Sequence, residues 1–170
     1  MGDLIKYEDW LTPEENDILQ PKIVNWNYGS GSLNDEDPRR MYMTPFWYID
    51  FSKDSFFNDY LLNKIRQTVG DDSLQLERVY ANGATYGQPG TLHQDSHEDN
   101  GRTFLFYANM KWNENWGGGT QFYDGDGMLT VVFPRPNRAV YFPGSVFHSS
   151  TDVNRAYKGL RVTIAWKLFK

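Results

Sequence analysis

The second part of the chain is a succession of short strand-like runs, and this pattern restricts the possible folds more than any other feature. The runs cover residues 74–79, 103–112, 120–123, 128–133, 138–142 and 160–169. Turn-forming glycine, proline, asparagine and aspartate separate them, at 117–119, 124–127, 134–137 and 143–144. Short strands joined in this way favour a sandwich or a jelly roll over a sheet whose strands alternate with helices.

The first part of the chain predicts two helices. Thr12, Pro13 and Glu15 form the capping pattern of a helix start, and Pro21 is expected to end that helix. The second helix has one apolar face, formed by Phe57, Leu61, Ile65 and Val69. Gly70 then has the place of a left-handed residue after the helix end.

Between the helices lies a segment rich in Gly, Ser, Asn, Asp and Pro, residues 27–45, followed by an aromatic strand at 46–51. A long loop of this kind is often a lid or a binding loop. We therefore expect one domain over residues 1–170. Residues 1–73 would supply helical support and the loop, and residues 74–170 would form a jelly-roll core. The fold class is mainly β with N-terminal helices (α+β), a double-stranded β-helix.

Composition excludes several classes of protein. The chain has no cysteine, so disulfide scaffolds, thiolate zinc sites and cysteine nucleophiles are excluded. A net charge of -5 argues against general binding to nucleic acid. The N-terminal residues lack the apolar core of a signal peptide, and no apolar run is long enough to span a bilayer. We expect a soluble cytoplasmic protein without a nucleic-acid or membrane partner.

Three residues form a candidate metal site. His93 and Asp95 are separated by one residue, so on an extended segment their side chains point to the same side. His148 follows 53 residues after Asp95, just past the Pro143-Gly144 turn. Two histidines and one carboxylate on one face of a metal leave the opposite positions open, as in non-haem Fe(II) oxygenases.

Arg161 is a candidate anion-binding residue, 13 residues after His148 in an apolar strand. It shares a face with Thr163 by the period of two. A guanidinium inside a barrel needs an anionic partner, and a dicarboxylate offers one through paired hydrogen bonds. Taken alone, Arg161 is more simply explained by a pair with an internal Asp or Glu, or by exposure to solvent.

Taken together, these residues resemble the 2-oxoglutarate and Fe(II)-dependent dioxygenase superfamily, in particular its prolyl 4-hydroxylase-like branch. The resemblance covers about residues 74–170 and follows the family order of motifs. The matching segments are residues 78–82, His93-x-Asp95, residues 104–109, 116–122 and 138–143, His148 and Arg161.

The resemblance implies a catalytic metal site in which His93, Asp95 and His148 hold Fe(II), and Arg161 binds the distal carboxylate of 2-oxoglutarate. Tyr107 aligns with a tyrosine that helps to hold that carboxylate, and Thr163 is a weaker candidate. The activity implied is hydroxylation by O2, coupled to decarboxylation of 2-oxoglutarate to succinate and CO2. Some members also use ascorbate. Collagen-type members have Lys where this chain has Arg161, and the gap of 13 residues between His148 and Arg161, which includes the loop at 151–158, is longer than in some relatives.

The substrate class and two further interpretations stay open. A peptidyl proline is the preferred substrate, and a free amino acid, a small metabolite or another protein side chain is the alternative. A metal-binding jelly-roll module without turnover would be favoured by a missing triad member, and none is missing. A cupin-type enzyme would need more histidines than the three present and would leave Arg161 without a role.

Two other motifs have simpler explanations. His97 lies in a polar segment and is expected to be exposed and not to bind the metal. Asp124-Gly125-Asp126-Gly127 lacks the further acidic ligands of a calcium loop, so a hairpin turn is expected.

Overall fold

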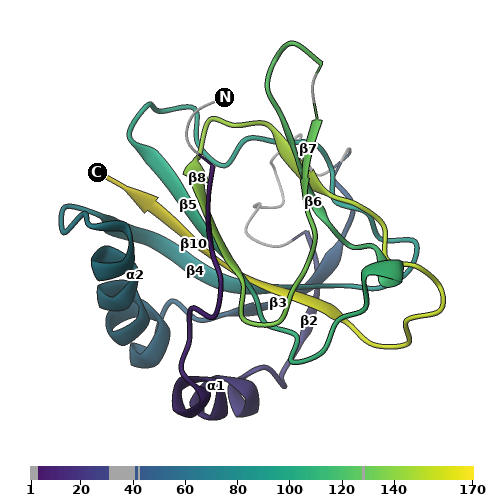
Figure 1. Ribbon diagram of the computed structural model, residues 1–170, viewed down its shortest axis with the longest axis horizontal. Helices are drawn as coiled ribbons and strands as arrows, with labels where there is room; N and C mark the ends of the chain where they lie inside the picture. The colour runs from purple at the N-terminus through teal and green to yellow at the C-terminus, as the bar shows by residue number, and fades with distance from the viewer. Residues whose placement is uncertain (1–3, 31–40, 42, 128) are drawn as a thin grey trace.

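The structure, a computed structural model, describes residues 4–30, 41, 43–127 and 129–170 and contains two antiparallel sheets in that part of the chain (Figure 1). The larger sheet has the order β1-β8-β5-β10-β4-β3-β2, and the smaller has the order β7-β6-β9. The strands of the larger sheet are β1 (Ile5–Tyr7), β2 (Asn27–Gly29), β3 (Phe46–Asp50), β4 (Gln75–Ala84), β5 (Gly101–Tyr107), β8 (Ala139–Pro143) and β10 (Arg161–Phe169). Those of the smaller sheet are β6 (Thr120–Tyr123), β7 (Leu129–Val132) and β9 (His148–Ser150). The predicted mainly β, double-stranded β-helix fold with N-terminal helices is confirmed.

The two helices begin and end for the reasons that the sequence indicates. α1 (Pro13–Leu19) starts at a capping box, in which the Glu15 N–H donates to the Thr12 hydroxyl and the Thr12 N–H donates to the Glu15 carboxylate. It ends before Pro21, which lies in a short 3-10 turn, Gln20–Lys22. A π-helical turn, Phe56–Tyr60, leads into α2 (Leu61–Val69), and Gly70 ends that helix with a φ of 75°.

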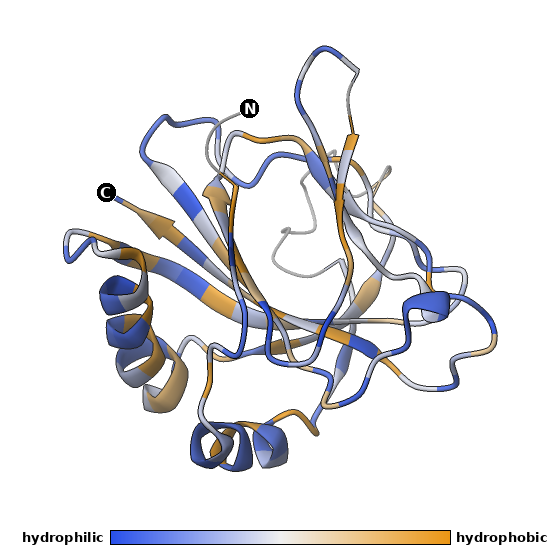
Figure 2. Cartoon of the chain, in the orientation of Figure 1, coloured by the Kyte–Doolittle hydropathy of each residue, from blue (hydrophilic) through white to orange (hydrophobic). Residues whose placement is uncertain are grey.

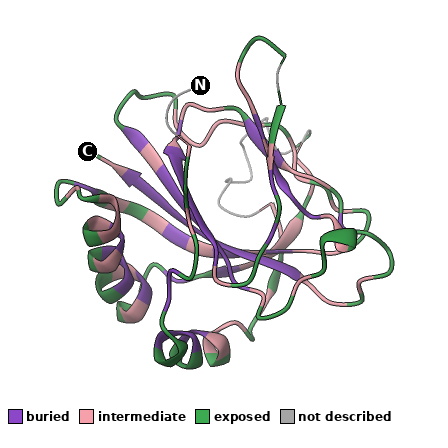
Figure 3. Ribbon diagram, in the orientation of Figure 1, coloured by how far each residue is buried: buried purple, intermediate pink, exposed green. Residues whose placement is uncertain are grey.

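Strand β10 separates two apolar cores because its side chains alternate between the two faces of the larger sheet. Ile164, Trp166 and Leu168 belong to the core formed with α1 and α2. Ala165 belongs to the second core, which includes Tyr107 and Phe122 and lies between the two sheets. Figure 2 shows hydrophobic residues on the side of α2 that faces the sheet, and Figure 3 shows β5 and β10 buried along most of their length. The face of β10 that carries Arg161, Thr163, Ala165 and Lys167, called its inner face below, is mostly polar.

Several strands differ from the predictions, among them β4, which continues to Ala84, and β9, which is not among the predicted runs. β1 pairs with β8 and β2 pairs with β3, yet both are short, largely exposed strands without an apolar pattern that would reveal them. β2 lies within the predicted loop 27–45, of which residues 31–40 and 42 are outside the described residues. The strand predicted at 103–112 already ends at Tyr107.

The side chain of Asn109 accounts for that early end. Its Oδ1 accepts the Val162 N–H at 2.7 Å and its Nδ2 donates to the Leu160 carbonyl at 2.8 Å. The side chain thus takes hydrogen bonds that a continuing strand would make through its backbone. In the described part of the chain, no helix has the length and apolar character needed to cross a membrane.

Candidate metal and co-substrate site

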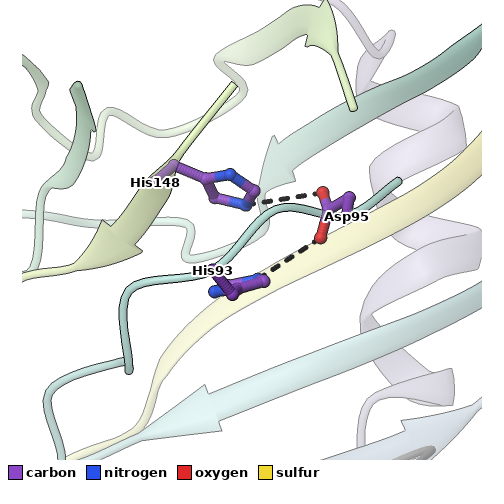
Figure 4. Close-up of side chains that lie close together, drawn as sticks. All are labelled: His93, Asp95 and His148. Carbon is purple, nitrogen blue, oxygen red and sulfur yellow. Dashed lines mark ion pairs between the residues drawn. The ribbon is translucent and has the colours of Figure 1, made fainter. Parts of the chain in front are cut away.

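The structure brings His93, Asp95 and His148 together from two segments that are far apart in the sequence (Figure 4). His93 and His148 form an isolated antiparallel bridge, with reciprocal N–H to carbonyl distances of 3.0 and 2.9 Å. The Asp95 N–H donates to the Gly144 carbonyl at 2.8 Å. Backbone pairing of the segment after β4 with the start of β9 therefore fixes all three side chains.

The three side chains converge on one point. The Nε2 atom of His93 lies 3.3 Å from Asp95 Oδ1, and the Nε2 atom of His148 lies 3.4 Å from Asp95 Oδ2. The three potential ligand atoms all lie within 4.8 Å of one another. The side chains of Asp95 and His148 are 4% and 8% exposed, whereas that of His93 is 36% exposed, so solvent reaches the site from the His93 side.

The hydrogen bonds of the two imidazoles show that the site fits a metal ion. Nδ1 of His93 lies 2.8 Å from the Thr91 carbonyl, and Nδ1 of His148 lies 2.9 Å from the Val146 carbonyl. A carbonyl oxygen only accepts, so both Nδ1 atoms carry a proton, and the neutral form of each imidazole points the lone pair of Nε2 towards Asp95. Lone pairs facing carboxylate oxygens repel one another unless a cation lies between them. Two imidazole nitrogens and a carboxylate are a donor set suited to non-haem Fe(II).

Burial and charge set the protonation states that metal binding needs. Burial lowers the pKa of His148 to about 4, against the opposing effect of Asp95. Burial alone would raise the pKa of Asp95, but the positive charge of Lys167 holds it well below its ordinary value. At neutral pH the site therefore offers neutral His148 and ionised Asp95, the forms that bind metal.

Two residues that the sequence analysis missed contact the Asp95 carboxylate. The Thr103 hydroxyl donates to Asp95 Oδ2 at 2.6 Å, and the Lys167 ammonium forms an ion pair with the same oxygen. The period of two along β10 was the available signal, because Lys167 falls on the same face as Arg161 and Thr163.

A cavity of about 500 Å³ contains both the triad and Arg161 in its wall. The inner face of β10 lines it with Arg161, Thr163, Ala165 and Lys167. The neighbouring strands β4 and β5 add residues at the same level, since Thr163 pairs with Asn82 and Tyr107, and Lys167 pairs with Arg78 and Thr103. One strand therefore connects the metal site to the predicted anion site.

Arg161 is buried, at 5% exposure, among neutral oxygen atoms. Its Nε donates to the Gly118 carbonyl at 2.8 Å, Nη2 to the Thr120 hydroxyl at 3.0 Å, and Nη1 to the Thr163 hydroxyl at 3.2 Å. Burial lowers the pKa of Arg161. No ion pair of Arg161 with a carboxylate is found among the described residues, so its charge is open to an anionic ligand.

The remaining predicted residues lie as follows. The Tyr107 ring is 5.4 Å from the Arg161 guanidinium, and its hydroxyl lies 2.8 Å from the Thr120 hydroxyl. The Tyr107 ring therefore lies beside Arg161, while its hydroxyl is linked to Arg161 through Thr120. The sequence analysis missed Thr120. Gly118 has a φ of 68°, and a Cβ atom there would lie 3.2 Å from Arg161 Cγ, which explains part of the Gly117–Gly119 run.

Two of the simpler interpretations agree with the structure. His97 is exposed and is not among the residues that converge on Asp95. Residues 124–127 lie in the connection between β6 and β7, which pair in antiparallel fashion as a hairpin does.

Comparison with known proteins identifies the family. The model of the 2OG-Fe(II) oxygenase superfamily matches residues 78–166, just over half of the chain. The chain belongs to this superfamily, and it resembles the prolyl 4-hydroxylase-like branch. The family uses Fe(II) and 2-oxoglutarate, in agreement with the donor set described above. Comparison with curated protein sequences gives no match.

Three solved structures illustrate the similarity of the fold. A prolyl-4-hydroxylase from Pseudomonas putida has a TM-score of 0.69 and 16% identity, covering 100% of this chain and 94% of that one. A prolyl hydroxylase from Trichoplax adhaerens, in complex with a hypoxia inducible factor peptide fragment, has a TM-score of 0.70 and 15% identity, covering 99% and 84%. HygX from Streptomyces hygroscopicus, with nickel, 2-oxoglutarate and hygromycin B bound, has a TM-score of 0.67 and 13% identity, covering 99% and 83%.

Proposed function

We propose that this oxygenase is a hydroxylase and that its substrate is a peptidyl proline. One observation carries the hydroxylase proposal. A metal-compatible triad and a buried arginine without a carboxylate partner among the described residues share the wall of one cavity. A 2-oxoglutarate molecule has the two ends that this cavity requires, a keto acid for the metal and a second carboxylate for the guanidinium.

The residues of this chain have separate roles in the proposal. His93, Asp95 and His148 hold Fe(II), and Arg161 binds the distal carboxylate of 2-oxoglutarate with help from Thr163. Tyr107 keeps Thr120 and thereby Arg161 in place. Bound Fe(II) and 2-oxoglutarate supply the oxidising power for hydroxylation by O2, with succinate and CO2 as co-products. The protein positions the substrate C–H beside the metal and shields that point from water.

The choice of proline is supported by similarity to two prolyl hydroxylases, one of them bound to a peptide. A second candidate is a small metabolite or free amino acid, which the similarity to HygX with hygromycin B favours. Succinate release measured against proline peptides and against free amino acids separates the two classes.

The first test is an anaerobic visible spectrum of the protein with Fe(II), before and after addition of 2-oxoglutarate. A charge-transfer band that needs both components is expected, and it should vanish in His148→Ala. His97→Ala is the matched control, because this exposed histidine lies outside the triad and the variant should keep the band. A band that survives His148→Ala, or that never forms, would contradict the proposal.

A further inference from the structure

The inner face of β10 carries two buried cations, Arg161 and Lys167, each with 5% exposure. Both line the same cavity, one at each end of the inner face of the strand. Arg161 is assigned to the co-substrate in the proposal above. Lys167 has no assigned task apart from its ion pair with Asp95, which is its only ion pair with a carboxylate in the part of the chain that the structure describes.

When Fe(II) and 2-oxoglutarate are both bound, the charges at the site do not sum to zero. The two positive charges of Fe(II) and those of Arg161 and Lys167 face the two negative charges of 2-oxoglutarate and that of Asp95. Glu77 and Arg78 also line the cavity but have opposite charges, so together they add none. One positive charge is left over, and it belongs to a lysine buried at the metal end.

The surroundings of Lys167 do not supply the missing negative charge. Its ammonium lies 5.9 Å from the centre of the Tyr80 ring, a neutral partner. Its partner across the strand pair is Thr103, whose hydroxyl already donates to Asp95. Once the metal takes the Asp95 charge, the buried ammonium is left with hydrogen-bond donors to spare and no full counter-charge.

The backbone has a β-bulge beside Lys167. The pairing of β10 with β4 shifts between Lys167 and Leu168, where Glu77 is the additional residue on β4. Such bulges are frequent beside active sites, where they redirect side chains. Here the shift coincides with the point at which Glu77 and Arg78 both reach the cavity wall.

We propose that Lys167 binds a carboxylate of the substrate, so that this oxygenase acts on a molecule with an acidic group close to the reacting carbon. The inference rests on the proposed function, because it takes the triad as the metal site and Arg161 as the co-substrate site. Since the reacting C–H lies beside the metal and Lys167 contacts the metal ligand Asp95, the carboxylate and that C–H are near neighbours. The carboxylate belongs either to a free amino acid or to an acidic residue next to the target in a peptide.

The test uses the full chain with Mn(II) and 2-oxoglutarate bound. Binding of each probe is measured as a rise in the thermal unfolding midpoint of this complex. The free-acid probes are L-proline and L-prolinamide, which keeps the ring ammonium but has a carboxamide in place of the carboxylate. The peptide probes are acetyl-Pro-Asp-amide and acetyl-Pro-Asn-amide. We expect at least one carboxylate probe to bind roughly ten- to hundredfold more tightly than its carboxamide counterpart, as for a charge-assisted hydrogen bond. The pair that shows the difference identifies the source of the carboxylate.

Variants separate this inference from the proposed function. Lys167→Met should lose the preference for the acidic probe, and Lys167→Arg should retain part of it. Lys158→Met, at an exposed lysine, is the matched control and should keep the preference. Equal binding of the carboxylate and carboxamide probes, absence of binding by both carboxylate probes, or an unchanged preference in Lys167→Met would overturn the inference. A missing 2-oxoglutarate-dependent shift in the wild-type protein would instead overturn the proposed function.

Discussion

The two ends of the cavity each hold a buried cation, but the cations are neutralised in different ways. At the metal end, Lys167 forms an ion pair with Asp95. At the other end, Arg161 donates only to neutral oxygens, those of Gly118, Thr120 and Thr163. The positive charge of Arg161 therefore has no counter-charge among the described residues until an anionic ligand binds, whereas the charge of Lys167 is balanced by Asp95 until a metal binds that carboxylate.

This difference shows how one strand can carry two buried cations that favour the binding of two different ligands. A buried charge without a counter-charge is costly, so the arginine end gains by receiving an anion. At the lysine end, Lys167 stabilises the metal-free protein through its ion pair with Asp95. When a metal binds Asp95, Lys167 is left without a full counter-charge. The following predictions test this contrast, from the largest expected effect to the smallest.

Replacement of Lys167 by Met should remove the internal cation that balances Asp95 at the metal end. The metal-free protein should lose about 3–5 kcal/mol of unfolding free energy, because Asp95 is left as a buried charge without its partner. Added Mn(II) should recover much of the loss, since the metal supplies the missing positive charge. Chemical denaturation with and without Mn(II) measures both effects. A loss of the same size in both conditions would show that Lys167 acts only through packing.

Replacement of Arg161 by Met should weaken 2-oxoglutarate binding by about 1.5–3 kcal/mol, the contribution of hydrogen bonds to a charged group. The unfolding free energy should change less than in Lys167→Met, since removal of a buried charge offsets the three lost hydrogen bonds. Calorimetric titration of the Mn(II)-loaded protein gives the affinity. Arg155→Met, at an exposed arginine, is the control, and an unchanged affinity in Arg161→Met would refute the assignment of the co-substrate.

Replacement of Thr103 by Val should lower the affinity for Mn(II) by roughly tenfold, as is usual when a hydrogen bond to a metal ligand is lost. The hydroxyl donates to Asp95 Oδ2 at 2.6 Å, so the variant leaves the orientation of that carboxylate to Lys167 alone. Binding of 2-oxoglutarate at the Arg161 end should change much less. Comparable losses of metal and co-substrate affinity would mean that the two ends are not independent.

Replacement of Thr120 by Val should reduce 2-oxoglutarate affinity by about 0.5–1.5 kcal/mol, less than Arg161→Met, because Thr120 acts on the co-substrate only through Arg161. Thr120 accepts from Arg161 and lies within hydrogen-bond distance of the Tyr107 hydroxyl, so the guanidinium loses one of its supports. Thr130→Val, at an exposed position of β7, is the matched control. An effect as large as that of Arg161→Met would show that Thr120 contacts the co-substrate itself.

Local chemistry made much of the fold predictable. The capping residues of α1, the apolar face of α2 and Gly70 each act through neighbours a few positions away, so their roles are visible in the sequence. The turn residues between the strands of the second part have the same property. β1 and β2 were missed because they form by pairing with distant strands and are too exposed to require apolar side chains.

The candidate site shows the same division. The spacing of His93 and Asp95 and the order of the motifs pointed to the triad and to Arg161. Nothing local to Asp95 indicated that Lys167 and Thr103 would contact its carboxylate. Nothing local to Arg161 indicated that Thr120 and the Gly118 carbonyl would surround the guanidinium.

The sequence by itself therefore determined where the two helices and most of the longer strands form, which residue types can bind a metal, and that Arg161 and Thr163 share a face of β10. The tertiary structure decided which polar residues meet and which charges are left open. The physical reason is that ion pairs and hydrogen bonds at this site join residues up to 72 positions apart, Asp95 and Lys167 among them. Their partners are set by the pairing of β10 with β4 and β5, and that register exists only in the folded sheet.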